Sequence, residues 1–161
     1  MDSKTKKYIV DNLRLPLRQY VSHYFALFFP FILIYAGLSK YGEDDSASTL
    51  IIIGILVLLY IIFRIESERR FKELVFDKDL STSEIGKLIE SNGWTLMANS
   101  NADGIIKLNT SSSSLDPGQT VTIMRVTKEK VLINTQPNGR AFFTFFKDIL
   151  NYNRVKKILE K

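Results

Sequence analysis

Cysteine is absent from this chain, and histidine and tryptophan occur once each, as His23 and Trp94. Without cysteine there is no disulfide, thiolate nucleophile, thiolate metal ligand or lipidated cysteine, which fits a reducing compartment. His23 lies between Tyr20 and Tyr24 with no carboxylate nearby in sequence. We therefore expect it to anchor an aromatic belt at a membrane interface. No cofactor or metal site is predicted.

Charge is missing from two long stretches, 20–39 and 48–63, which are both strongly apolar. A bilayer core requires roughly 20 predominantly apolar residues in a helix. The sequence therefore predicts a two-helix transmembrane hairpin over 20–65, with helices at 20–39 and 48–65. No charged residue lies deep in either stretch, which argues against an ion pathway within one subunit.

Small residues that allow helices to approach closely are scarce in the hairpin. Ala36, Gly37 and Gly54 are present, but no small-x-x-x-small spacing joins them. Contacts between the two helices are therefore expected to be loose. Pro30 lacks an N–H and is expected to kink the first helix.

The charges around the hairpin predict its orientation. The loop at 40–47 carries Glu43, Asp44 and Asp45, whereas Lys and Arg gather at the two outer ends of the hairpin. Positive residues flank membrane helices on the cytoplasmic side. We therefore expect a multi-pass protein of the cytoplasmic (inner) membrane, with both termini in the cytoplasm.

Two charged segments flank the hairpin. Residues 1–19 form a basic arm in which Ile9, Val10, Leu13 and Leu17 share one helical face. This pattern is compatible with an amphipathic helix on the inner leaflet or with a disordered arm. Residues 66–80 alternate in charge sign and are interpreted as a charged helical linker that continues the second membrane helix.

The remainder, 81–161, is predicted to be a cytoplasmic α+β domain. A capping box, Ser81 to Glu84, opens a helix that ends near Asn92-Gly93. Four short strands follow, at 94–98, 105–109, 121–126 and 131–135, and an amphipathic helix closes the domain. Its apolar stripe includes Ile149. Short connections predict an antiparallel four-stranded sheet with helices on one face.

Two sets of residues are candidates for contacts with other molecules. Phe143 is displaced from the face shared by Phe142, Phe145 and Phe146, so it is either part of the core or an exposed contact for a partner. The second set comprises cations that could meet anionic lipid head groups. They are Arg64, Arg69, Arg70, Lys72, Arg154, Lys156 and Lys157.

The net charge of +5 raises the question of nucleic acid. No recognised binding motif accompanies it, and basic flanks are ordinary for membrane helices, so nucleic acid is not expected as a partner. The serine run 111–114 lacks a Gly-rich phosphate cradle and a histidine to activate a nucleophile. No catalytic constellation is visible, and the chain is not expected to be an enzyme.

Several segments resemble small uncharacterised two-helix membrane proteins of the Bacteroidota. These segments are the Asn92-Gly93-Trp94 turn, the strand at 118–123 and the strand end at 131–134. The segment at 144–153 departs from the pattern of that group and keeps only Asn151 and Asn153. The resemblance implies a bacterial origin and no particular activity.

Together these features favour a non-enzymatic membrane protein whose hairpin anchors a cytoplasmic protein-binding module. Such a module would act as an accessory, assembly, immunity or regulatory subunit of a membrane complex, with a protein partner or a second copy of the chain. The alternative is a module that binds anionic lipid at the membrane surface or serves in envelope stress.

Overall fold

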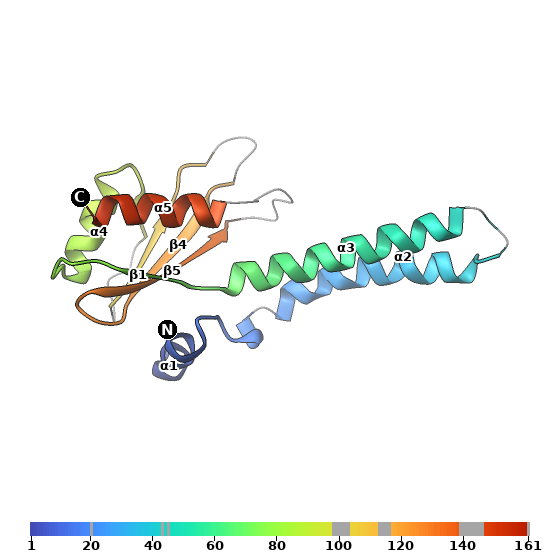
Figure 1. The fold of residues 1–161 in the computed structure, drawn as a ribbon, viewed down its shortest axis with the longest axis horizontal. Coiled ribbons are helices and arrows are strands. Elements are labelled where there is room, and N and C mark those ends of the chain that lie inside the picture. The colour runs from blue at the N-terminus through green and yellow to red at the C-terminus, as the bar shows by residue number, and fades with distance from the viewer. Residues whose placement is uncertain are drawn as a thin grey trace. The chain divides into compact units, whose positions relative to one another are not determined.

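The computed structural model describes residues 1–19, 21–42, 44, 46–97, 104–112, 117–138 and 147–160 (Figure 1). Within them the chain forms five α-helices, two 3₁₀ segments and one five-stranded antiparallel sheet. These elements divide into two compact units. The helical unit is Leu15–Arg69, and the α+β unit combines Met1–Arg14 with Arg70–Lys161.

The helical unit is built from four consecutive helical segments. They are η1 (Leu17–Gln19), η2 (Val21–Leu27), α2 (Phe28–Ser39) and α3 (Ser46–Arg69). Among the described residues one helix, α3, is long and apolar enough to cross a membrane; the apolar helix Tyr24–Ser39 is shorter. The distortion expected at Pro30 takes the form of a change from 3₁₀ to α geometry two residues before it.

Glycines bring α2 and α3 into close contact, contrary to the loose packing expected from the sequence. A Cβ placed on Gly37 would lie 2.7 Å from Cγ1 of Ile51, and one on Gly54 would lie 2.6 Å from Cγ1 of Ile34. Both glycines are buried, as is Ala47. The small-x-x-x-small criterion missed this contact because it requires small residues spaced along one helix. Here each glycine instead faces an isoleucine of the other helix.

The α+β unit is organised by a sheet with the strand order β1-β5-β4-β3-β2, in which every pairing is antiparallel. The first strand in sequence is thus paired with the last, Lys72 opposite Ile133 and Val75 opposite Lys130. The strands are β1 (Lys72–Val75), β2 (Thr95–Leu96), β3 (Ile105–Asn109), β4 (Gln119–Arg125) and β5 (Lys130–Pro137).

Strand β1 corrects two expectations from the sequence. The sheet has five strands rather than four, and the segment 66–80 is not a helical linker, because α3 ends at Arg69 and β1 begins at Lys72. The strand reads Lys-Glu-Leu-Val, and of these four residues only Leu74, at 3% exposure, is buried. Only one side chain of this edge strand is fully buried, so its apolar pattern is too short to stand out in a charged segment.

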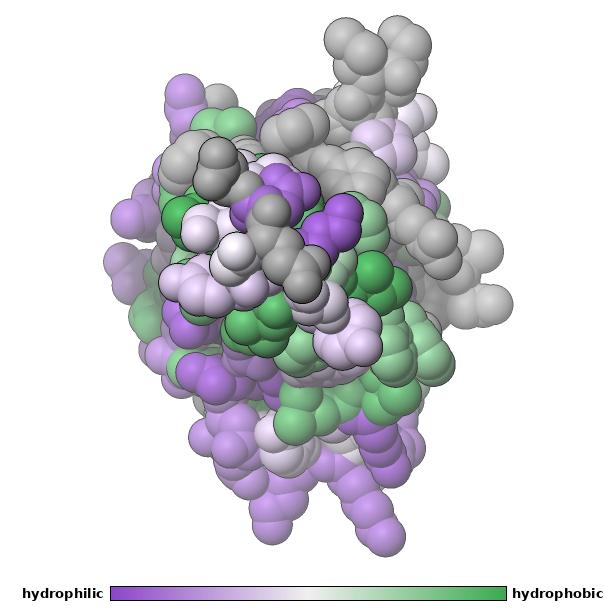
Figure 2. Space-filling view, turned by 90° about the vertical axis from the view of Figure 1, so that its right-hand side faces the viewer, coloured by the Kyte–Doolittle hydropathy of each residue, from purple (hydrophilic) through white to green (hydrophobic). Residues whose placement is uncertain are grey.

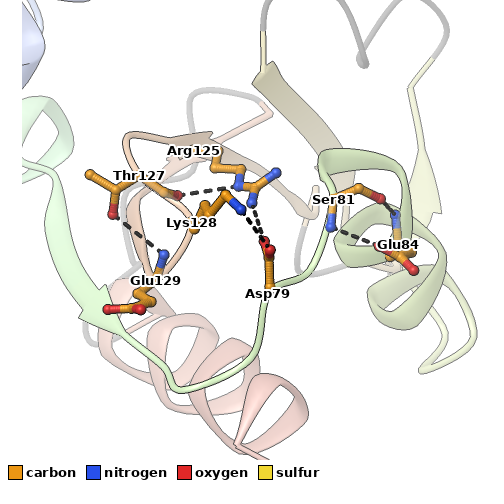
Figure 3. Close-up of polar contacts among 7 residues, drawn as sticks. All are labelled: Asp79, Ser81, Glu84, Arg125, Thr127, Lys128 and Glu129. Atoms are coloured by element: carbon orange, nitrogen blue, oxygen red, sulfur yellow. Dashed lines mark hydrogen bonds and ion pairs between the residues drawn. The ribbon is translucent and has the colours of Figure 1, made fainter.

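One face of the sheet carries the main core. Ile106, Ile123 and Ile133 lie side by side on neighbouring strands, and all three are buried. Helices α4 (Thr82–Glu90) and α5 (Lys147–Leu159) pack against this face through Ile85, Ile89, Val155 and Leu159. The predicted capping box is confirmed, since Ser81 and Glu84 exchange hydrogen bonds at the start of α4 (Figure 3).

The opposite face of the sheet is also buried, which the sequence did not predict. Ile105, Met124 and Leu132 align across β3, β4 and β5 and alternate with the core residues, so they point away from α4 and α5. The remaining helix of this unit is α1 (Ser3–Asn12), with Ile9 fully buried. Figure 1 shows α1 and α5 on opposite sides of the sheet. We infer that α1 covers this second face.

Helix α1 replaces the arm expected at 1–19. It ends at Asn12 with Leu13 in the left-handed conformation at φ 51°. The carbonyl oxygen of Leu13 accepts a hydrogen bond from the N–H of Phe71, 2.8 Å away, next to the start of β1. The buried side of α1, which contains Ile9, packs against the sheet. It is therefore not available to enter an inner leaflet, as one interpretation of the sequence proposed.

Candidate interaction surfaces

The titratable groups of the described residues form no obvious reactive centre. No group of three or more His, Cys, Asp or Glu side chains among them is placed to hold a metal ion. The clearest polar cluster joins the segment before α4 to the β4–β5 turn (Figure 3). There Asp79 accepts hydrogen bonds from Arg125 and Lys128, each at 3.0 Å.

Hydrogen bonding explains the shifted pKa values in this cluster. The pKa of Asp79 is lowered below its ordinary value, mainly because the Lys128 ammonium donates to its carboxylate. The pKa of Glu84 is likewise lowered, mainly by its hydrogen bonds to Ser81. Both carboxylates are stabilised in the charged form and tie local segments together, so the cluster is structural.

Two of the cations proposed for lipid head groups lie in the helical unit and are engaged there. Arg64 forms an ion pair with Glu68 at 2.8 Å, one turn further along α3. Arg69 is 4% exposed; its Nε donates to the carbonyl oxygen of Leu15 at 3.0 Å, and its guanidinium pairs with Glu66. Arg69 is therefore a buried structural cation and not a head-group contact.

The other five cations lie in the α+β unit. Lys72 forms an ion pair with Asp148 at 2.8 Å, and Arg154 stacks over the Trp94 ring, 5.4 Å from its centroid. Lys156 has a longer ion pair with Glu160, at 3.7 Å. Arg70 and Lys157 expose their side chains. The structure therefore assigns contacts within the chain to most of the proposed set.

The aromatic candidate, Phe143, lies outside the described residues. The helix that follows it nevertheless differs from the expected pattern, because Ile149 is 43% exposed and not part of the core. Its neighbour Leu150 is 61% exposed. Further along the same side of α5 the exposed residues are polar, so we define the α5 outer face as Ile149, Leu150, Asn153, Lys156 and Lys157.

The sequence pattern wrongly placed Ile149 in the buried stripe of this helix, for an identifiable reason. Ile149 fits a three- and four-residue spacing with Tyr152 and with the aromatic run before the helix. The buried stripe instead runs through Asn151, Val155 and Leu159, rotated away from Ile149. The polar Asn151 concealed the true stripe, because a stripe is recognised by its apolar residues.

The helical unit carries the most apolar surface of the described chain. Large side chains on the outside of α2 and α3 include Phe28, Tyr35, Leu56 and Phe63, each at least 60% exposed. Figure 2 shows a broad apolar area, in green, beside hydrophilic residues.

In comparisons with family models, curated proteins and solved structures, nothing matches this chain.

Proposed function

We propose that this protein is a non-enzymatic, two-pass protein of a bacterial inner membrane whose hairpin anchors a cytoplasmic module that binds a protein partner. The observation that carries the membrane part is the arrangement of the helical unit. Its small residues Gly37, Ala47 and Gly54 are inside, and most of its large apolar residues are outside. A helix pair in water buries its large apolar side chains, whereas in lipid close packing of small residues holds helices together.

The combined length of η2 and α2 supports two membrane passes. Helix α2 alone has 12 residues, or about 18 Å at the α-helical rise, which is too short for a bilayer core. The 7 residues of η2 precede it and add about 14 Å at the 3₁₀ rise. The two segments together span about 32 Å, enough for the roughly 30 Å of hydrocarbon that α3 can cross alone.

The position of the charges supports the proposed orientation. Asp44 lies in the loop between α2 and α3, where its pKa is lowered chiefly by a hydrogen bond from the Ser46 backbone. Arg64, Arg69 and Arg70 lie at the other end of α3. By the positive-inside rule the loop faces outward, and both termini lie in the cytoplasm.

The orientation can be tested because the native chain has no cysteine. Two variants each carry a single cysteine, Tyr41→Cys in the loop or Ser83→Cys on α4. Intact cells that express either variant are treated with a membrane-impermeant maleimide. We expect labelling only at position 41, with position 83 labelled after the cells are opened. Labelling of position 83 in intact cells, or recovery of the protein in the soluble fraction, would contradict the proposal.

The α5 outer face supports a protein partner. Its exposed Ile149 and Leu150 form an apolar start, and Lys156 and Lys157 form a basic end. Apolar anchors with a charged rim are the usual anatomy of a protein interface. The partner expected from this pattern offers an apolar pocket bordered by carboxylates.

The partner is tested by mild extraction of tagged full-length protein and native mass measurement. Leu150→Asp should remove a stoichiometric partner, because it places a charge in the apolar part of the face. Leu88→Asp makes the same substitution at an exposed leucine of α4, outside the α5 outer face, and should retain the partner. A complex that survives Leu150→Asp, or a monomer without any substitution, would argue against this surface and favour lipid as the ligand of the module.

A further inference from the structure

Helix α1 has two contrasting sides. Thr5 and Ile9, one turn apart, are buried at 2% and 0% exposure. The opposite side carries four residues at helical spacing, Lys4, Lys7, Tyr8 and Asp11, all exposed. We call these four residues the α1 outer face.

The two lysines of the α1 outer face differ from most of the cations discussed above. Within the part of the chain that the structure describes, neither Lys4 nor Lys7 forms an ion pair, whereas Arg64, Lys72 and Lys156 all do. Asp11 follows Lys7 by one turn but is not paired with it. The other carboxylate of this helix, Asp2, accepts the backbone N–H of Thr5 at 3.1 Å and caps the helix.

The chain segment that connects α1 to the helical unit is short. Helix α1 ends at Asn12 and η1 begins at Leu17, so only residues 13–16 separate the two elements. Such a short connection maintains a high effective concentration of the lysines near any bilayer that holds α2 and α3. Because Ile9 is committed to the sheet, contact with lipid has to be made through the charged side of the helix and not by insertion of its apolar side.

We propose that the α1 outer face binds the anionic head groups of the leaflet from which the hairpin emerges. This inference rests on the membrane anchoring proposed above. Lys4 and Lys7 supply the positive charge, and the amphipathic ring of Tyr8, 39% exposed, suits the head-group region. Asp11 opposes the attraction and limits its strength. The surface thus biases α1, and the sheet it covers, toward anionic lipid.

The test uses full-length protein in nanodiscs. A nitroxide is attached at Ser3→Cys, on the exposed flank of α1, and its relaxation by a nickel-chelating lipid head group is measured in discs of phosphatidylcholine with and without phosphatidylglycerol. We expect phosphatidylglycerol to bring the label closer to the head groups. Replacement of both lysines, Lys4→Gln with Lys7→Gln, should lower the equilibrium constant for this contact roughly thirtyfold, and Asp11→Asn should raise it roughly fivefold.

The matched control is Lys78→Gln with Lys87→Gln, which removes two exposed lysines elsewhere in the α+β unit and outside the α5 outer face. If this control lowers the contact as much as the α1 variant, or if discs without phosphatidylglycerol give the same contact, the inference is overturned. If the protein does not enter discs, the anchoring proposal fails and the inference falls with it. Incorporation is measured separately by co-elution, so the two failures are distinguishable.

Discussion

The γ-carbon of Ile34 fills the space where Gly54 lacks a side chain, and Ile51 does the same at Gly37. Each isoleucine precedes the glycine of its own helix by three residues, so the two helices present the same Ile-x-x-Gly pattern to each other in antiparallel directions. The contact is therefore reciprocal. A hairpin of this kind has one close-packed register, because sliding either helix would place a larger side chain against isoleucine.

Gly54→Ala should destabilise the hairpin by about 1–3 kcal/mol, because the new Cβ overlaps Ile34. Unfolding by denaturing detergent in mixed micelles measures the loss. Adding Ile34→Ala should restore part of it by removing the overlapping carbon, although the Pro30 carbonyl oxygen, 3.1 Å from the same Cβ, remains. A variant as stable as the native protein would show that the helices are not in this contact.

Ile9→Ala should destabilise the α+β unit by about 2–3 kcal/mol, because it removes a fully buried side chain from the second face of the sheet. Trp94, the single tryptophan and only 2% exposed, reports unfolding by its fluorescence. The control is Val10→Ala, at a site 37% exposed, where a change within about 0.5 kcal/mol is expected. Equal effects of the two substitutions would contradict the packing of α1 on the sheet.

Ser81→Ala should cost about 1 kcal/mol, because it removes the hydroxyl that caps the amide of Glu84. It should also raise the pKa of Glu84 toward its ordinary value, because the hydrogen bonds to Ser81 are the main cause of the lowered value. Titration followed by NMR gives the pKa, and denaturant unfolding gives the stability. Ser83→Ala, in the same turn but outside the capping box, should leave the pKa of Glu84 unchanged.

Asp79 makes stability depend on pH in the acid range. Its pKa is lower in the folded protein, so its ionised form stabilises the fold fully above the ordinary value of 3.8, and that contribution is lost as the pH falls through the folded-state pKa. The urea midpoint of Asp79→Asn should therefore lie below that of the native protein at neutral pH and converge with it in acid. Asp77→Asn serves as the control, and a gap that persists in strong acid would exclude this linkage.

Local signals in the sequence predicted much of the α+β unit. The capping box at Ser81 located α4, and alternation of Val121, Thr122 and Ile123 located β4. What the sequence did not indicate depends on distant partners. Strand β1 becomes recognisable only when Leu74 is paired with Val131, and the buried side of α1 depends on a sheet formed much later in the chain.

The candidate surfaces were less predictable than the fold, for a similar reason. Lys72, Arg69 and Lys4 are alike as basic residues near an apolar run, yet Asp148 neutralises the first, burial removes the second from the surface, and the third stays exposed. Only tertiary structure distinguishes these outcomes, because the acidic and carbonyl partners lie far away in sequence.

The pairing of the first strand with the last also constrains how the protein is made. Synthesis proceeds from the amino terminus, so the hairpin and β1 leave the ribosome before Lys130–Ile133, the partners of β1, have been translated. During that interval Leu74 and Ile9 lack the sheet that buries them, while the apolar hairpin is already available to the insertion machinery. If the hairpin is a membrane anchor as proposed above, its insertion can therefore precede folding of the α+β unit, and a nascent chain arrested before Lys130 would be anchored but unable to complete its sheet.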